Sequence, residues 1–336
     1  MATPIKGDWI TGLIANAAAP TATKRDVARN LAVEMTCLIN NGWTAFDSYL
    51  ILKDGSQNHT LTLILNVHLN PILPSGIPRQ MRLPFFDFDN VMWLIRPWTR
   101  TEWTRFVQNF KREAARWTNR FWLVPPASYT GLDVKIGATS VRPNVYCHLY
   151  INVVEDAANA HTSISVVNLD KDFAKTSMGF SEQDLKDGQF RSHSTLYGNY
   201  DALPDANTST TDIHGTVTNV TNFSTVAHEI GHSLGLPHIG VSHKDPLCSL
   251  AVLMDDTLPA ASKSTLPALF NGGSNSNACY GHLALPERGA NIMGGGTTFE
   301  ASNAAPWAAR MALHTATTAT DWSVETKLSA ATPKPV

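Results

Sequence analysis

One short segment carries histidine and glutamate side chains at a spacing that suits metal chemistry. It runs from His228 to His238 and reads HEIGHSLGLPH. Residues four apart on an α-helix lie on the same face, so His228 and His232 can bind one ion from a rigid backbone. Glu229 is rotated by about 100° from His228 on such a helix. This direction suits contact with a metal-bound water better than direct ligation.

A third ligand can come from His238 only if the helix ends first. His238 lies too far beyond His232 to share the same straight helix face. Gly235 provides the end, because glycine tolerates the left-handed conformation that terminates helices. Pro237 then stiffens the return toward His238. The sequence therefore predicts three imidazole ligands, His228, His232 and His238.

This ligand set favours zinc and hydrolytic chemistry. Three neutral imidazoles with one position left for water are typical of catalytic zinc sites. Zinc lowers the pKa of bound water from 15.7 toward about 7, so Glu229 can act as the general base while the metal polarises a carbonyl. The prediction is a zinc-dependent endopeptidase with Glu229 as the catalytic residue and a protein or peptide as substrate. The alternative is a non-catalytic binding or adhesion protein with a relic zinc site.

The residues around the motif support a helix with its apolar face turned to the core. They recur at helical spacing and centre roughly 160° away from the direction of the two histidines. We therefore expect the apolar face to be buried and the histidines to face a cleft. The stripe consists of Phe223, Val226, Ala227, Ile230 and Leu234.

The motif resembles the extended zinc signature of the metzincin clan of zinc endopeptidases. The resemblance covers residues 220–315 and implies an α+β domain with a small twisted sheet, a backing helix, an active-site helix, a methionine-containing turn and a C-terminal helix. The best counterpart of the turn is residues 290–294, with Met293 as a packing residue beneath the site. Met254 is the competing choice at a shorter spacing. Met293 is preferred because three glycines follow it and suit a tight turn.

The segment after His238 resembles the pappalysin-type group within this clan. That resemblance implies a disulfide between Cys248 and Cys279 and a calcium ion at Asp255 or Asp256. Gly295 stands where astacins and serralysins have a tyrosine. The group that stabilises the oxyanion is therefore open, and Tyr280 and His282 are candidates by polarity and position.

Composition limits the class of protein. The 336 residues carry a net charge of -2 and only 16% charged side chains, which gives no basic surface for nucleic acid. No apolar run reaches the 18 or more residues of a membrane span. The abundance of Thr, Asn, Ser and Ala is common in exported proteins, and four cysteines are compatible with an oxidising compartment. The oligomeric state is not predicted.

The expected location is extracellular, as a secreted or injected toxin-like effector. Residues 1–6 lack the charged start and long apolar stretch of a secretory signal. Removal of a signal, export by a dedicated secretion machine and retention inside the cell all remain open.

Three regions are predicted along the chain. Residues 1–90 are expected to form an accessory, targeting or pro-region, because prolines and a glycine break regular structure between Asn70 and Pro84. In a pro-region, Cys37 could block zinc as a thiolate. Residues 91–320 are expected to be the catalytic domain, and residues 321–336 a loose tail.

Regular elements are predicted from periodicity and capping. A short helix is expected at 24–39, a hairpin from 46–52 and 61–68, and strands at 132–138, 145–154 and 161–169. Thr99 and Glu102 form a capping box before a long aromatic stripe that ends at Phe121. A last helix is expected at 303–315, with Pro306 in its first turn.

Overall fold

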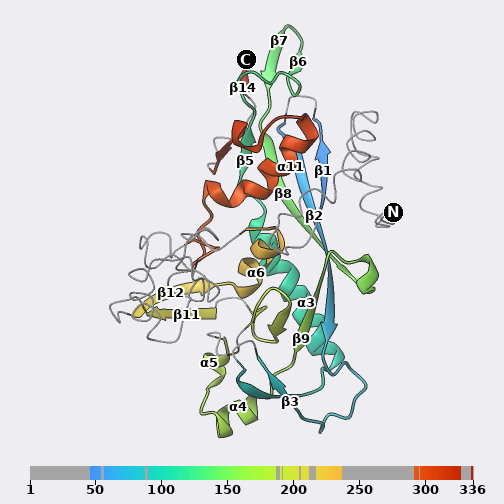
Figure 1. The fold of residues 1–336 in the computed structure, drawn as a ribbon, viewed down its shortest axis with the longest axis vertical. Coiled ribbons are helices and arrows are strands. Elements are labelled where there is room, and N and C mark those ends of the chain that lie inside the picture. Colours follow the sequence, from blue (N-terminus) through green and yellow to red (C-terminus); the bar gives the residue numbers. More distant parts are fainter. Residues whose placement is uncertain are drawn as a thin grey trace, which may run out of the picture.

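A seven-stranded mixed sheet forms the centre of the protein in the computed structural model (Figure 1). Its order is β10-β9-β2-β8-β5-β13, and β1 pairs with β2 beside this path. The structure describes residues 46–53, 57–87, 90–186, 190, 192–203, 206–211, 217–236, 291–294, 296–326 and 334–335. The strands of the sheet are β1 (Asp47–Ile51), β2 (His59–Pro71), β5 (Trp122–Val124), β8 (Val145–Val154), β9 (Thr162–Val167), β10 (Leu196–Gly198) and β13 (Ser323–Glu325).

The strands confirm much of the predicted pattern. Strands β1 and β2 form the expected antiparallel hairpin, with Asp47 opposite Ile64. The strands predicted at 145–154 and 161–169 are β8 and β9, and both run parallel to β2. Within β8 the side chains of Val145, Cys147 and Leu149 are buried. The predicted α+β class is therefore confirmed at the level of a mixed sheet with helices.

The boundary predicted at residue 90 does not divide this sheet. Strand β2 lies at its centre, between β8 and β9. The prolines after β2 turn the chain out of the sheet into a separate two-stranded hairpin, β3 (Leu83–Phe86) and β4 (Met92–Ile95). Proline ends a strand because it cannot donate to the ladder, but it does not have to end a domain. Residues 46–86 therefore belong to the same fold as the motif.

The C-terminal segment also differs from its prediction. Strand β13 pairs with β5, so residues 323–325 close one edge of the sheet. Strand β14 (Lys334–Pro335) pairs with β7 (Thr139–Arg142), which also pairs with β6 (Val134–Ile136). Trp322 is 4% exposed. Residues 323–325 and 334–335 are therefore paired strands, which the sequence did not predict because strands this short show no readable alternation.

Three helices cover one side of the long strands. They are α3 (Arg100–Ala114), α6 (Thr225–Ser233) and α11 (Ala305–Thr315), and Figure 1 shows all of them on the same side of β2 and β8. Helix α3 begins at the predicted capping box and continues into the 3-10 turn η2 (Ala115–Trp117). Helix α11 follows the 3-10 turn η4 (Ala301–Ala304) and carries proline in its first turn, as predicted. One apolar core joins these helices to the sheet.

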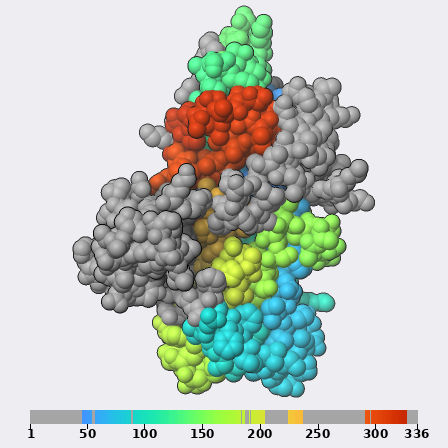
Figure 2. Space-filling view, viewed as in Figure 1, coloured from blue at the N-terminus to red at the C-terminus, as the bar shows by residue number. Residues whose placement is uncertain are grey.

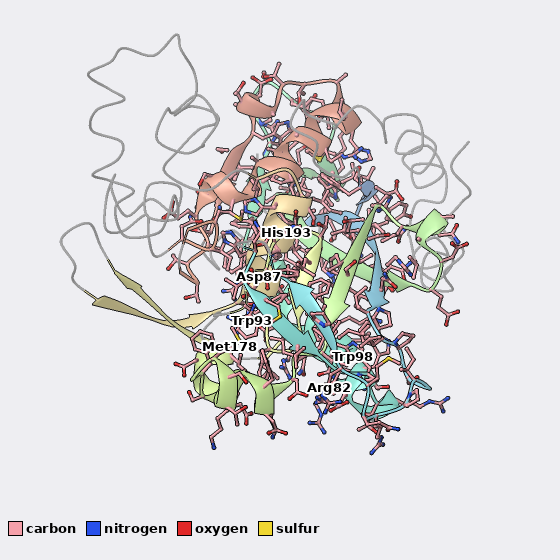
Figure 3. The ribbon with its side chains drawn as sticks, turned by 60° about the horizontal axis from the view of Figure 1, so that its bottom comes forward. Arg82, Asp87, Trp93, Trp98, Met178 and His193 are labelled. Atoms are coloured by element: carbon pink, nitrogen blue, oxygen red, sulfur yellow. The ribbon has the colours of Figure 1, made fainter. Side chains whose placement is uncertain are left out.

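A second apolar cluster lies at the end of the molecule that holds the β3–β4 hairpin. It combines this hairpin with α4 (Lys171–Ser177) and α5 (Glu182–Lys186) around Trp93. The indole Nε1 of Trp93 donates to Asp87 Oδ2 at 2.9 Å. Figure 3 shows Asp87, Trp93 and Met178 together at this end. The cluster packs against β9 through Val167 and against β10 through Leu196. It contains none of the motif residues.

Candidate metal centre

Helix α6 carries the first part of the motif and has a defined beginning and end. It follows the hairpin of β11 (Ala206–Thr211) and β12 (Val217–Phe223). Ser224 caps it by accepting a hydrogen bond from Ala227 N at 3.2 Å. At the other end Gly235 has φ +87°, the left-handed conformation predicted for it. The helix therefore ends at Gly235, as the prediction for the motif requires.

Both faces of α6 are buried. Val226, Ala227, Ile230 and Leu234 enter the core, as the stripe predicted. Figure 2 shows only a small part of the α6 segment, in gold, on this face of the molecule. The motif side chains are also largely covered, with His228, Glu229 and His232 exposed by 1%, 8% and 7%. These three side chains therefore present little surface to solvent.

The two histidines of α6 lie close together, and a backbone carbonyl fixes the orientation of each ring. Their rings are 4.8 Å apart and nearly perpendicular, at 88°. Nδ1 of His228 lies 2.7 Å from the carbonyl oxygen of Ile292, and Nδ1 of His232 lies 2.8 Å from that of Leu236. A carbonyl only accepts, so each Nδ1 carries the hydrogen and each Nε2 carries the lone pair. This is the tautomer in which histidine commonly ligates metals, with the other nitrogen held by a carbonyl.

A tight turn lies directly beneath the histidine pair. Met293 N donates to Asn291 Oδ1 at 2.8 Å, and Gly294 N donates to Asn291 O at 2.8 Å. The amides of Asn291 and Asn303 exchange two hydrogen bonds of 3.1 and 3.2 Å, which tie the turn to η4. The turn supplies both the Ile292 carbonyl to His228 and the buried Met293 side chain to the core.

Gly231 lets this turn approach the helix closely. A Cβ atom placed on Gly231 would lie 3.1 Å from Met293 Cε and 2.8 Å from Trp117 Cζ2. Trp117 also donates from Nε1 to Ala227 O at 2.8 Å. Met293 and Trp117 therefore pack against the helix at Gly231. Sequence reasoning placed Met293 beneath the site, but it did not identify Gly231 or Trp117.

Burial controls the charges of the site. It raises the pKa of Glu229 to about 8, with the carboxylate of Asp201 adding to the shift. Burial also lowers the pKa of His232 to about 4, although its bond to the Leu236 carbonyl opposes the change. A neutral imidazole at neutral pH suits ligation. A divalent cation bound beside Glu229 would favour its ionised form.

Asp201 is a second buried acid near the site, and no motif predicted it. Its Oδ2 accepts from Gly198 N at 2.6 Å and from Ser192 Oγ. The side chain of Thr225, in the first turn of α6, also hydrogen-bonds this carboxylate. Burial raises the pKa of Asp201 to about 6 despite these bonds. Asp201 therefore fastens the start of α6 to the loop after β10.

The remaining predicted site residues lie outside the described residues. They are His238, Met254, Tyr280, His282, the cysteines Cys37, Cys248 and Cys279, and the acids Asp255 and Asp256. Within the described ranges no group of three or more His, Cys, Asp or Glu side chains is placed to hold a metal. The fit of zinc therefore depends on the donor chemistry of His228 and His232. In the same ranges, Cys147 is a buried free thiol.

Comparison with protein-family models, curated proteins and solved structures finds no match to this chain. None of the helices in the described ranges has both the length and the apolar character needed to cross a membrane.

Proposed function

We propose that this protein is a zinc-dependent endopeptidase of the metzincin type. The observation that carries the proposal is the shared orientation of His228 and His232 on α6. Both rings turn Nδ1 to a backbone carbonyl and leave the lone pair on Nε2. A purely structural histidine has no need of this matched tautomer at a four-residue spacing with a glutamate between.

His228, His232 and His238 would hold the metal in this proposal. When bound, zinc supplies a Lewis acid that polarises the peptide carbonyl and lowers the pKa of a water molecule. Glu229 takes the proton of the attacking water and passes it to the amide nitrogen as the C–N bond breaks. Its largely buried carboxylate keeps this proton transfer away from bulk water.

The arrangement of elements supports the same proposal. In it, α3 serves as the backing helix, α6 as the active-site helix and α11 as the C-terminal helix. The turn around Met293 serves as the methionine turn, because it packs beneath α6 and orients His228 through Ile292. These roles are held by elements joined in one apolar core.

Peptide cleavage by a matched set of variants tests the proposal. Zinc-loaded wild type, Glu229→Gln and Glu155→Gln are incubated with a diverse peptide library, and new termini are counted by mass spectrometry. Glu155 is exposed and lies in the turn after β8. Glu229→Gln should bind one zinc per chain yet lose roughly 10²- to 10⁴-fold in rate, the usual contribution of a general base. Glu155→Gln should match wild type. Equal rates for Glu229→Gln and wild type would refute the endopeptidase and favour a relic zinc site.

A further inference from the structure

Tyr197 is a buried side chain that the proposed mechanism has not yet used. It stands in the middle of β10, is 0% exposed, and its hydroxyl has no hydrogen-bond partner among the described residues. Buried hydroxyls in native proteins are nearly always hydrogen-bonded. A buried tyrosine without a partner therefore points to a group that it meets only in another state of the protein.

Tyr197 lies close enough to the motif helix for the charge of Glu229 to act on its hydroxyl. Its ring packs on Phe110 of α3, with 6.0 Å between ring centroids. The loop that follows β10 carries Asp201, which hydrogen-bonds Thr225 at the start of α6. Thr225 and Glu229 are four residues apart, so they share one face of that helix. In Figure 2 the yellow atoms around β10 lie beside the gold atoms of α6.

Burial and nearby negative charge keep the Tyr197 hydroxyl protonated, so it can donate a hydrogen bond. Burial raises its pKa well above the usual value, and the nearby carboxylates of Glu229 and Asp201 raise it further. The hydroxyl therefore keeps its hydrogen throughout the neutral range. Asp201 already accepts from Gly198, Ser192 and Thr225. The carboxylate of Glu229 receives no hydrogen bond from the described residues.

We propose that Tyr197 is a positioning residue for the general base, and that its hydroxyl donates to the carboxylate of Glu229 in the zinc-loaded protein. The inference rests on the proposed function. Catalytic hydrogen bonds often tighten only when the full site is assembled. One carboxylate oxygen of Glu229 would be held by Tyr197, which leaves the other directed at the water that it deprotonates.

The Tyr197→Phe variant separates this role from a structural one. It removes only a hydroxyl that has no partner in the described structure, so the melting temperature should stay the same or rise. The kcat for peptide cleavage should fall on the order of 10- to 100-fold, as a misdirected base implies, while KM and the zinc content stay within about twofold of wild type. Tyr200→Phe is the matched control, because Tyr200 is also buried but its hydroxyl bonds Asn199. It should lower the melting temperature and preserve kcat.

Infrared spectroscopy gives a readout that does not depend on turnover. Subtraction of the zinc-loaded Glu229→Gln spectrum from that of wild type isolates the carboxylate band of Glu229. Tyr197→Phe should shift this band and Tyr200→Phe should not. A kcat within twofold of wild type, an unchanged band, or a joint loss of kcat, zinc and melting temperature in Tyr197→Phe would each overturn the inference. If Tyr197→Phe shifts the band but wild type cleaves no peptide, the proposed function is refuted and the contact between Tyr197 and Glu229 still stands.

Discussion

Gly231 sets how closely the metal helix can approach the turn beneath it. Its missing side chain leaves room for Met293 and Trp117, which pack against the helix at this position. An alanine there would gain up to about 1 kcal/mol of helix propensity. It would also overpack the contact, which typically costs about 1–3 kcal/mol. The packing penalty is the larger of the two, so the glycine is required by contact and not by backbone conformation.

Gly231→Ala should therefore destabilise the protein, and Met293→Ala should partly relieve it. Met293→Ala alone should cost about 2–5 kcal/mol as a buried methionine truncation. The double variant should be more stable than the sum of the two losses predicts, by at least about 0.5 kcal/mol, because the residues share one contact. Urea unfolding of the four proteins measures this coupling. Additive losses would show that Met293 does not pack on Gly231.

The sequence revealed the site residues that are close together along the chain and missed those that are not. The spacing of His228, Glu229 and His232 identifies them because a helix brings such neighbours onto adjacent faces. Asp201 and Tyr197 belong to no motif and precede the helix by a hairpin and a loop. Tyr197 is placed by the pairing of β10 with β9, and Asp201 by its bond to Thr225. Such non-local contacts leave no periodic pattern in a sequence.

Helix α3 shows how an element is fixed by its first turn. Thr99 N donates to Glu102 Oε2 at 2.9 Å, and Glu102 N donates to Thr99 Oγ1 at 3.2 Å. Arg96 adds a bond of 2.8 Å to Glu102 Oε1. Partial burial would raise the pKa of Glu102, but the bonds from Arg96 and Thr99 outweigh it and lower the pKa to about 2. The capping box was predictable because all its parts are local.

The stabilising effect of Glu102 should depend on pH. A lowered carboxyl pKa stabilises the fold above the unfolded value of 4.5, and this stabilisation disappears as the pH falls toward about 2. Glu102→Gln should thus cost about 1 kcal/mol at pH 7, the usual size of a helix cap, and progressively less below pH 4.5. Urea midpoints at several pH values test this, with Glu155→Gln as the exposed control. If Glu102→Gln lowers the stability by the same amount at every pH, the effect comes from side-chain packing and neutral hydrogen bonds and not from the charge of Glu102.

In the whole molecule, one sheet combines strands from both ends of the described sequence. Strand β2 occupies the centre of the sheet, and β13 completes one edge. The β1–β2 hairpin was predicted correctly from the sequence. It was assigned to a separate region because the prolines after β2 indicate a boundary, whereas nothing local indicates that β8 and β9 pair with β2. The order of strands depends on contacts between segments far apart, which neither periodicity nor capping encodes.

Truncation of the C-terminal segment tests whether β13 stabilises the sheet or belongs to a loose tail. A chain that ends after Thr318 loses β13 and Trp322, whose Nε1 donates to Thr317 Oγ1 at 2.7 Å and whose ring lies 6.1 Å from that of Tyr129. Its melting temperature should drop sharply, because loss of a buried tryptophan alone costs about 3–5 kcal/mol. A chain that ends after Thr326 keeps β13 and should lose much less. Equal melting temperatures for both chains would support the loose-tail prediction.

The proposed activity requires that two imidazoles of α6 and a third beyond Gly235 bind one zinc ion and leave one position for water. X-ray absorption at the zinc edge of the loaded full chain tests this most directly. The predicted spectrum shows three imidazole nitrogens at about 2.0–2.1 Å and one further light ligand from water, and His232→Ala should remove one imidazole shell. A spectrum with four protein ligands, or one that His232→Ala leaves unchanged, would contradict a catalytic zinc site at these histidines.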